Sequence, residues 1–403
     1  MLLAGIDQSQ KKHDVCLMNE LGRQLARFEI PHHVQGFQRL HEERQKIQVS
    51  PQDCLVALES GHSLLVDYLL DQCYQVYVIP GKAVDRYRDR HRQSRSASDR
   101  TDAVVLAEVL RTDRHLHTPW HADQPITREV GSLVTLVHDL KRSVVRITNR
   151  LRSLLWRYYP IAAELFSGLD KQIALQFIQA YPTPQQAKQL TSTQFTAFCR
   201  AHQYRRSDLI TRRHGQLLNA ETFASSEVAA AYASQAQALA RVTFSLLKER
   251  DRAQKQLTQA FEQHPDYPIF QSLPGAGEFL APALLSRFRD CRARFPTAAV
   301  AQAIAGTSPV TVQSGKKRRV QFRHACDKDF RYYAGQFSRC SIQRAPWATA
   351  YFATVRPRYE KASQAYRCLA NRWIAIIWRL WTDRVAYDEA VHLRNRHIGH
   401  RPG

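Results

Sequence analysis

The sequence predicts an α/β domain followed by a mainly α-helical remainder, and three observations support this fold class. Short strand-like segments alternate with helical ones over the first hundred or so positions, two long helical stretches with heptad spacing follow, and helical spacing then continues to the end. A chain of 403 residues with 44% hydrophobic content can bury more than one core. We therefore expect three domains, at residues 1–125, 126–265 and 266–403.

The first domain opens with three short strands joined by polar turns. These strands are expected at residues 2–6, 13–18 and 24–28, and they are followed by a helix at 34–45, a strand at 54–58, a helix at 63–73, a strand at 75–79 and a helix after Ser98. Three antiparallel strands followed by alternating helix and strand is the order found in ribonuclease-H-like (RuvC-like) domains. The same order also suits other α/β folds.

The chain is strongly basic. Lys and Arg number 58 against 36 Asp and Glu, which gives a net charge of +22 and indicates a polyanionic partner, with nucleic acid the simplest choice and a membrane surface the alternative. No apolar run is long enough to span a membrane, and no signal-peptide pattern precedes the first strand, so we expect a cytoplasmic protein with no membrane partner. The eight cysteines are scattered, which indicates neither a zinc site nor a disulfide framework.

Four carboxylates fall at the ends of the expected elements. Asp99 and Asp102 open an otherwise apolar helix that Ser98 can cap, and they lie on one side of it. Two acids in a first helical turn can simply reflect the helix dipole. However, Asp7 ends the first strand and Glu59 ends the fourth. Because adjacent strand ends and a helix N-terminus can converge, the four side chains predict a site for Mg²⁺ or Mn²⁺.

Such a metal site would suit phosphoryl transfer on nucleic acid. Two hard cations can activate an attacking oxygen and stabilise a leaving one. A basic stretch that we expect to be a polar, mobile loop precedes Asp99, where it is either a solvated charge run or a phosphate-binding element. Its cations are Lys82, Arg86, Arg88, Arg90, Arg92 and Arg95.

The middle of the chain predicts a coiled coil. A seam with spacings of three and four ends before Pro160, and a looser seam occupies residues 227–261. The two helices could pair with each other or with a second protomer. Residues 161–226 contain short helical pieces, and we interpret the whole middle region as an assembly scaffold. The first seam contains Val130, Leu133, Val137, Leu140, Val144, Ile147, Leu151, Leu154 and Tyr158, and the second Leu239, Val242, Leu246, Ala253 and Leu257.

A glycine turn opens the third domain. Pro274, Gly275, Ala276 and Gly277 precede an apolar helix expected at residues 279–288. Backbone N–H groups in such a turn can approach a phosphate closely, as in helix-hairpin-helix elements, although an ordinary interhelical turn has a similar composition.

The second unusual stretch contains a serine among cations. Gln313, Ser314 and Gly315 are expected in a turn, and four cations follow at once: Lys316, Lys317, Arg318 and Arg319. A loop serine is usually a solvated turn residue. A serine beside a flexible glycine and four cations could instead attack a phosphodiester, and Ser308 is the weaker candidate for that role.

The remaining basic and aromatic residues extend a positive surface and fill a core. Arg323, Lys328, Arg331 and Arg339 carry the charge. Core packing explains the aromatic residues better than base stacking does. These are Tyr332, Tyr333, Phe337, Trp347, Tyr351 and Phe352. A last helix is expected at residues 361–381 with a buried stripe of Trp373, Ile377 and Leu380, followed by a basic tail at residues 392–403.

Together, these motifs resemble one known family, the DEDD insertion-sequence transposases numbered one-ten, which include Piv-type DNA invertases. Asp7, Glu59 and the Asp99–Asp102 pair, followed by SLPGAG, AGTSP and QSGKK, occur in the family's order. The resemblance covers most of the chain. It implies a RuvC-like N-terminal domain, a coiled-coil middle and a C-terminal transposase domain.

The resemblance also implies roles and partners. Asp7, Glu59, Asp99 and Asp102 would bind the metal, and Ser314 would form a covalent phosphoserine link to DNA. Partners would be the DNA of element ends and target, a non-coding bridge RNA that pairs with both, and further copies of the chain, from a dimer to a tetramer with composite sites. Gly275, Gly277, Lys316, Lys317, Arg318, Arg319 and Arg323 are the expected nucleic-acid-binding residues.

We therefore expect a recombinase that cuts and rejoins the DNA of a mobile element. Two alternatives remain open. In one, the chain is a hydrolytic RuvC-like nuclease, such as a Holliday junction resolvase, in which water attacks and Ser314 is a loop residue. In the other, it is a non-catalytic nucleic-acid-binding scaffold whose acids are structural.

Overall fold

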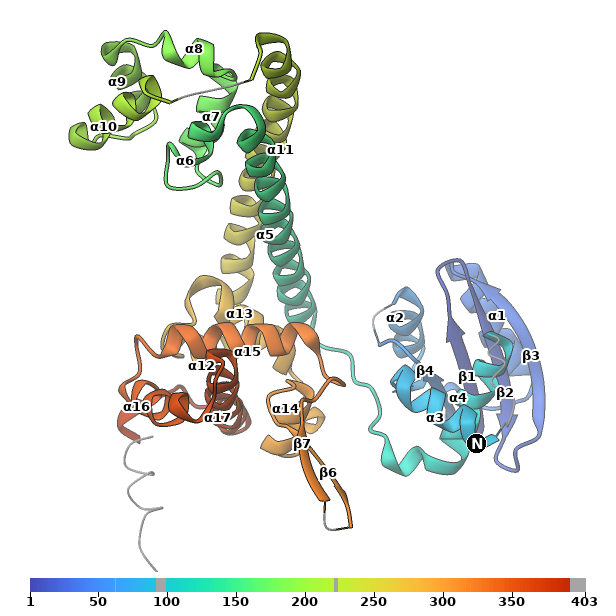
Figure 1. Ribbon diagram of the computed structural model, residues 1–403. Coiled ribbons are helices and arrows are strands. Elements are labelled where there is room, and N and C mark those ends of the chain that lie inside the picture. Colours follow the sequence, from blue (N-terminus) through green and yellow to red (C-terminus); the bar gives the residue numbers. More distant parts are fainter. Residues whose placement is uncertain (62, 92–98, 221–223, 316, 392–403) are drawn as a thin grey trace, which may run out of the picture. The chain divides into compact units, whose positions relative to one another are not determined.

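The computed structural model describes residues 1–61, 63–91, 99–220, 224–315 and 317–391 (Figure 1). The chain divides into two compact units, Met1–Gln124 and Pro125–Gly403, which we describe separately. The finer division into three domains stays a prediction. In the described ranges, every helix is too short or too polar to cross a membrane.

The first unit is built on a five-stranded sheet with the order β3-β2-β1-β4-β5. The strands β1 (Leu2–Gln8), β2 (Lys12–Asn19) and β3 (Gln24–Pro31) are antiparallel, and β4 (Cys54–Leu58) and β5 (Gln75–Val78) continue the sheet in parallel with β1. All five expected strands are therefore confirmed. A mixed α/β sheet of this order is compatible with a RuvC-like domain.

Both faces of the central strands are buried, because helices cover each side of the sheet. On one face, Leu2, Ala4 and Ile6 pack against α1 (Val34–Lys46) and α2 (Leu64–Asp71). On the other face, Leu3 packs with residues of α3 (Gly81–His91) and α4 (Asp99–Asp113). A parallel central pair buried in this way explains the nearly continuous apolar runs of β1 and β4.

The α4 helix lies unusually close to β1 at Gly5. A Cβ atom on Gly5 would lie 1.9 Å from the Ala103 carbonyl oxygen and 2.5 Å from the Ala107 nitrogen. Glycine is therefore required there by the approach of the two backbones. Because Gly5 lies two residues before Asp7, and Ala103 follows Asp102, this contact fixes the spacing between two of the expected site elements.

The expected loop before Asp99 is wrong for residues 81–91, which form the helix α3. Val84 is fully buried in the core beneath the sheet, and Asp85 and Arg88 form an ion pair one turn apart. Ala83 and Tyr87 also pack, partly buried, against this core, and the (i, i+3) pair adds to the stability of the helix. The side chains of Lys82 and Arg90, and the whole of Arg92, Arg95 and the capping residue Ser98, lie outside the described residues.

The second unit contains the two long helices, α5 (Pro125–Tyr158) and α11 (Ser226–Glu262), which run alongside each other (Figure 1). They pair with each other within the chain, which is one of the two expected arrangements. Along α5 the predicted seam is confirmed in part. Its members Val130, Val137, Val144, Leu151, Leu154 and Tyr158 are buried, whereas Leu133, Leu140 and Ile147 are only partly buried and Val134 and Thr148 are buried beside them.

For the first half of α11 the predicted seam is wrong by one position. Val242 is 47% exposed, whereas Ala236, Ala240 and Thr243 are fully buried. The spacing of the large apolar residues predicted the wrong seam because small side chains form the contact with α5. Alanine at the seam lets the backbones of two helices approach closely, and the leucines then lie beside the contact rather than in it.

The expected short helices between the two long ones are confirmed. They are α6 (Pro160–Glu164), α7 (Gln172–Ala180), α8 (Pro184–Lys188), α9 (Ser192–Ala201) and α10 (Ser207–Leu218). They share a core with the adjacent ends of α5 and α11. One arginine of this region, Arg213, lies over the rings of Phe166 and Tyr204, so it contributes to packing as well as to charge.

The C-terminal part of this unit is helical apart from one hairpin. Its elements are α12 (Tyr267–Gln271), α13 (Gly277–Phe288), α14 (Ala298–Ile304), β6 (Val310–Ser314), β7 (Lys317–Gln321), α15 (Lys328–Ser341), α16 (Pro346–Val355) and α17 (Ala362–Asp383). Four 3₁₀ turns, at Pro51–Asp53, Arg114–Leu116, Arg292–Arg294 and Arg356–Arg358, complete the described elements.

Aromatic side chains fill the core of this part, as expected. Tyr333, Phe337 and Trp347 are buried, and Trp373 is buried in α17 together with Trp381. The predicted stripe of α17 is confirmed at Trp373 and Ile377, whereas Leu380 is partly exposed and the buried position belongs to its neighbour Trp381. Tyr332 differs from the other aromatic residues, since it is 46% exposed. The tail from residue 392 lies outside the described residues.

Candidate functional site

The sheet places two of the expected carboxylates at one edge. Ile6 of β1 is the register partner of Leu58 of β4, so Asp7 and Glu59 each follow one member of this parallel pair. Asp7 still belongs to β1, and Glu59 comes directly after β4. Asp102 joins them from the first turn of α4, the helix that packs against β1. The side chain of Asp99 lies outside the described residues.

A guanidinium group occupies the coordination space of Asp102. The Asp102 Oδ1 atom accepts hydrogen bonds from Arg88 Nη2 at 2.7 Å and from Arg88 Nε at 2.9 Å. The same arginine reaches Asp85 Oδ1 through Nη1 at 3.3 Å. The Arg88 and Asp102 side chains are 18% and 15% exposed, so the pair is largely shielded from water. Sequence reasoning missed Asp85 altogether. Its spacing of three from Arg88 was the available signal.

Glu59 lies in the electrostatic range of these acids. Partial burial raises the pKa of the Glu59 carboxyl, the nearby charges of Asp102 and Asp85 raise it further, and Arg88 opposes the shift. Its Oε2 atom lies 3.1 Å from the position that a Cβ atom on Gly81 would take, so the carboxylate reaches the start of α3. The negative charges near Glu59 favour its protonated form, and a nearby cation would oppose that effect.

The donor chemistry of this site fits Mg²⁺ or Mn²⁺. Asp7, Glu59 and Asp102 offer hard carboxylate oxygens, the ligands that these ions prefer. Within the described residues, no three His, Cys, Asp or Glu side chains are grouped closely enough to hold an ion. The Arg88 guanidinium supplies the positive charge at Asp102 in this arrangement.

The serine lies in the second unit, at the tip of the β6–β7 hairpin. Ser314 is the last residue of β6 and is the register partner of Lys317, the first residue of β7. The expectation that Gln313 and Ser314 form the turn is therefore wrong, because both belong to the strand. Of the three residues expected in the turn, Gly315 lies beyond the end of the strand. Gly315 has φ +55°, a conformation that favours glycine in tight hairpins.

The strand register determines which residues share the serine's face. Side chains alternate along a strand, so Val312, Lys317 and Arg319 lie on the face of Ser314. The described side chains of this face are exposed, and Val312 is 46% exposed. The side chains of Lys316 and Arg318 lie outside the described residues. A serine hydroxyl beside two cations on an exposed ribbon can approach a phosphodiester.

The base of the hairpin is held by Arg323. Its Nε donates to the Ser308 carbonyl at 3.2 Å, and its Nη2 lies 3.5 Å from the Pro309 carbonyl. Arg323 thus fixes the start of β6, which adds a positioning role to the nucleic-acid contact expected of it. Ser308 lies at this base, six residues from the tip.

The glycine turn before α13 has a packing role. Gly275 has φ +83°, and a Cβ atom there would lie 2.8 Å from the Cys340 carbonyl oxygen of α15. Gly277, with φ +59°, faces open space at its Cβ position. The structure therefore explains Gly275 by close helix packing, and α13 begins at Gly277 rather than at residue 279.

Comparisons with known proteins agree with this combination of parts. Residues 4–160 match the DEDD transposase family of the IS110 group, and residues 267–353 match the family described as transposase IS116/IS110/IS902. The chain is 31% identical to the candidate transposase of the IS117 mini-circle from Streptomyces coelicolor, over 96% of this chain and 95% of that protein. It is 24% identical to an uncharacterized 42 kDa protein of insertion element IS900 from Mycobacterium paratuberculosis, over 82% of each.

The mixed α/β sheet, the mainly helical remainder and these matches together define a DNA transposase. The chain belongs to the IS110/IS116/IS902 family of insertion-sequence transposases. DNA is accordingly its partner, and cutting and rejoining DNA is its general activity.

Proposed function

We propose that the chain cuts and rejoins DNA through a covalent phosphoserine intermediate on Ser314. The observation that carries this proposal is the position of Ser314 at the tip of an exposed hairpin, opposite Lys317 and on the face of Arg319. An exposed hydroxyl flanked by cations is suited to attack a phosphodiester, because the cations stabilise the charge that develops on phosphorus-bound oxygens.

The proposed step exchanges one phosphoester bond for another. The Ser314 Oγ–P bond forms while the P–O bond to one deoxyribose breaks; the hydroxyl proton leaves to solvent, and the departing sugar oxygen takes up a proton. Because the phosphoester is retained on the protein, a second strand's hydroxyl can reverse the step and join to the phosphate. The reaction then needs no external energy source.

The carboxylates would serve as the metal site. Asp7, Glu59 and Asp102, with Asp99, are the residues that would hold Mg²⁺ or Mn²⁺, and such ions supply Lewis-acid polarisation of a phosphate when bound. The chain's own contribution is to hold these acids on rigid elements, two at adjacent strand ends and one on a helix locked against β1.

We further propose that a non-coding RNA guides the choice of DNA sequence and that copies of the chain act as a dimer or tetramer. The family resemblance suggests both, and the net charge of +22 favours polyanionic partners. In such a system, base pairing between the RNA and the DNA would select the DNA sequence, and the protein would recognise the backbone and shape of the nucleic acids.

A hydrolytic nuclease is the rival proposal, since sheet-edge carboxylates with bound metal are sufficient for attack by water. A suicide substrate separates the two. The full-length protein is incubated with Mg²⁺ and an element-end duplex interrupted by a nick near the cleavage position, which lets the short fragment diffuse away. Wild type should accumulate protein joined to DNA, whereas Ser314→Ala and Asp7→Ala should not.

Ser308→Ala provides the matched control, because Ser308 lies at the hairpin base and should leave the adduct in place. Cutting by wild type with no covalent product would overturn the phosphoserine proposal in favour of hydrolysis. DNA binding that is unchanged in Asp102→Asn, without any cutting by wild type, would favour the non-catalytic scaffold.

A further inference from the structure

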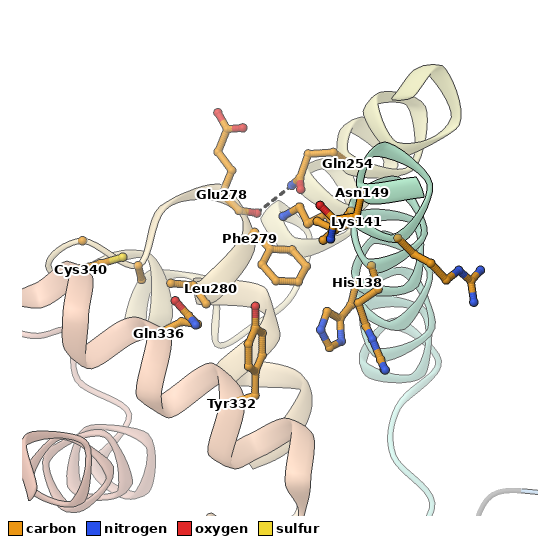
Figure 2. Close-up of a pocket in the computed structure, with 15 residues that line it drawn as sticks. His138, Lys141, Asn149, Gln254, Glu278, Phe279, Leu280, Tyr332, Gln336 and Cys340 are labelled. Atoms are coloured by element: carbon orange, nitrogen blue, oxygen red, sulfur yellow. Dashed lines mark hydrogen bonds between the residues drawn. The ribbon is translucent and has the colours of Figure 1, made fainter. Parts of the chain in front are cut away.

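The second unit contains a large open groove away from the serine hairpin. It has a volume of about 1110 Å³ and lies between α5 on one side and the start of α13 with α15 on the other (Figure 2). Gln254 of α11 closes one side, where its side chain donates to the Glu278 carbonyl at 2.9 Å. Nothing in the proposed chemistry uses this groove.

One wall of the groove is basic. Lys141, Arg142 and Arg146 line it from α5, and Glu278 is the sole carboxylate among the lining residues that the structure describes. Arg142 and Arg146 are exposed and lie four residues apart, so their side chains project from the same face of the helix about one turn, roughly 5.4 Å, from each other. This wall is suited to a chain of phosphates.

The opposite wall is aromatic. Tyr332 of α15 reaches the basic wall and stacks on His138 of α5, with ring centroids 5.1 Å apart and planes 20° apart, so that one face of its ring is covered while 46% of the residue remains exposed. Phe279 of α13 also lines the groove, with the Lys141 ammonium 3.5 Å from its ring centroid. Burial, with a contribution from Arg250, lowers the pKa of Lys141 to about 8, so an anion in the groove would stabilise its charged form.

We propose that this groove binds unpaired nucleotides of single-stranded DNA, with a base on the aromatic wall at Tyr332 and phosphates along Arg142 and Arg146. Exposed aromatic faces beside a basic track are the combination by which proteins hold single strands without reading sequence. The inference rests on the proposed function, because strand cutting and exchange expose unpaired DNA near the protein. An apolar peptide would leave the charges of three cations uncompensated.

The test measures binding without chemistry. Full-length protein is titrated, in EDTA, into a fluorescein-labelled 12-nucleotide single-stranded DNA, and anisotropy is followed over a range of salt concentrations. A second oligonucleotide carries 2-aminopurine, whose fluorescence falls when the base stacks on an aromatic ring. Tyr332→Ala should weaken binding roughly 5-fold or more and abolish the quenching, because the base then has no tyrosine ring on which to stack.

The double variant Arg142→Gln/Arg146→Gln should bind single-stranded DNA with a weaker dependence on salt. The slope of log K against log salt should become about 1.4 shallower, because each phosphate that is no longer neutralised contributes about 0.7. The matched controls are Arg150→Gln and Trp156→Ala, two exposed positions on α5 that do not line the groove, and both should bind as wild type. Folding of each variant is checked by its melting temperature.

Unchanged affinity and quenching in both groove variants would overturn the inference. So would a loss confined to an RNA 12-mer of the same sequence, which would assign the groove to RNA. Because the assay contains no metal and forms no adduct, its result is independent of whether Ser314 is the nucleophile.

Discussion

The Arg88 guanidinium lies against the Asp102 carboxylate, with Nη2 2.7 Å from Oδ1, and so holds a positive charge among the carboxylates at the sheet edge. Without that charge, Asp102 and Asp85 would both face Glu59 uncompensated. The pair therefore stabilises the cluster in the absence of a metal ion, and a bound ion and the arginine have overlapping electrostatic roles.

Replacing Arg88 should make the stability of the protein depend on metal. In EDTA, Arg88→Gln is expected to lower the free energy of unfolding by about 1–3 kcal/mol, because the largely buried Asp102 carboxylate loses its ion pair. Added Mg²⁺ should restore more stability to this variant than to wild type. Thermal melts with and without Mg²⁺ measure both effects, with Arg86→Gln, an exposed position on the same helix, as control. Equal stability of Arg88→Gln and wild type in EDTA would refute the role given to the pair.

Gly5→Ala should displace α4 or prevent the first unit from folding. The added Cβ atom would lie 1.9 Å from the Ala103 carbonyl oxygen, and neither backbone segment can yield without breaking the packing. We expect a loss of about 3 kcal/mol or more, measured by denaturant unfolding. Gly335→Ala is the matched control: its Cβ position in α15 is open, so alanine should be neutral or stabilise the helix by about 0.5–1 kcal/mol. A well-folded, wild-type-like Gly5→Ala protein would contradict the close approach.

The alanine seam of α11 should not tolerate large side chains. Ala240 is fully buried against α5, whereas Ala238 is exposed, two residues away on the same helix. Ala240→Leu is expected to cost about 1–3 kcal/mol through overpacking, and Ala238→Leu to change stability by less than about 0.5 kcal/mol. Urea unfolding of the two variants compares them directly. Similar effects of both would argue for the alternative seam through Leu239 and Val242.

The first unit should lose stability in mild acid because of His13. This side chain is 1% exposed, and its Nε2 lies 2.8 Å from His32 Nδ1. Burial, with the neighbouring His32, lowers the pKa of His13 to about 4. The unfolded chain then takes up a proton more readily than the folded one, so stability is complete above about pH 6.5 and falls as the pH is lowered to 4, by roughly 3 kcal/mol.

His13→Gln separates this contribution from those of other groups, because glutamine can keep a hydrogen bond to His32 but does not titrate. Its free energy of unfolding should fall less steeply between pH 6.5 and 4 than that of wild type. If the free energies of unfolding of the two proteins fell in parallel with pH, His13 would be excluded as the source of the acid sensitivity.

The sheet and the long helices were predictable because their signals are local. Strand alternation, heptad spacing and the Pro160 break each lie within a few residues of the element they define. The order of the elements alone predicted that Asp7 and Glu59 lie at the same edge of the sheet. The seam of α11 was not predictable, because hydrophobicity ranks Leu239 and Val242 above the alanines that actually form the contact.

For the candidate site, the sequence predicted the participating residues better than the contacts that they make. The helix α3 was missed because six cations in fourteen residues look like a loop, while one buried side chain, Val84, and a pair between Asp85 and Arg88 support a helix. Likewise, the contacts of Arg323 with backbone carbonyls depend on how the chain returns to the hairpin base, which no spacing reveals.

The central claim is that the Ser314 hydroxyl becomes joined to DNA, and the most direct measurement is mass spectrometry of the adduct trapped on the nicked element-end substrate. After nuclease and trypsin digestion, the tryptic peptide from Phe295 to Lys316 contains both Ser314 and Ser308, so fragmentation distinguishes them. The account predicts a nucleotide remnant on Ser314. A remnant on Ser308 or on any other residue, or an adduct that persists in Ser314→Ala, would contradict it.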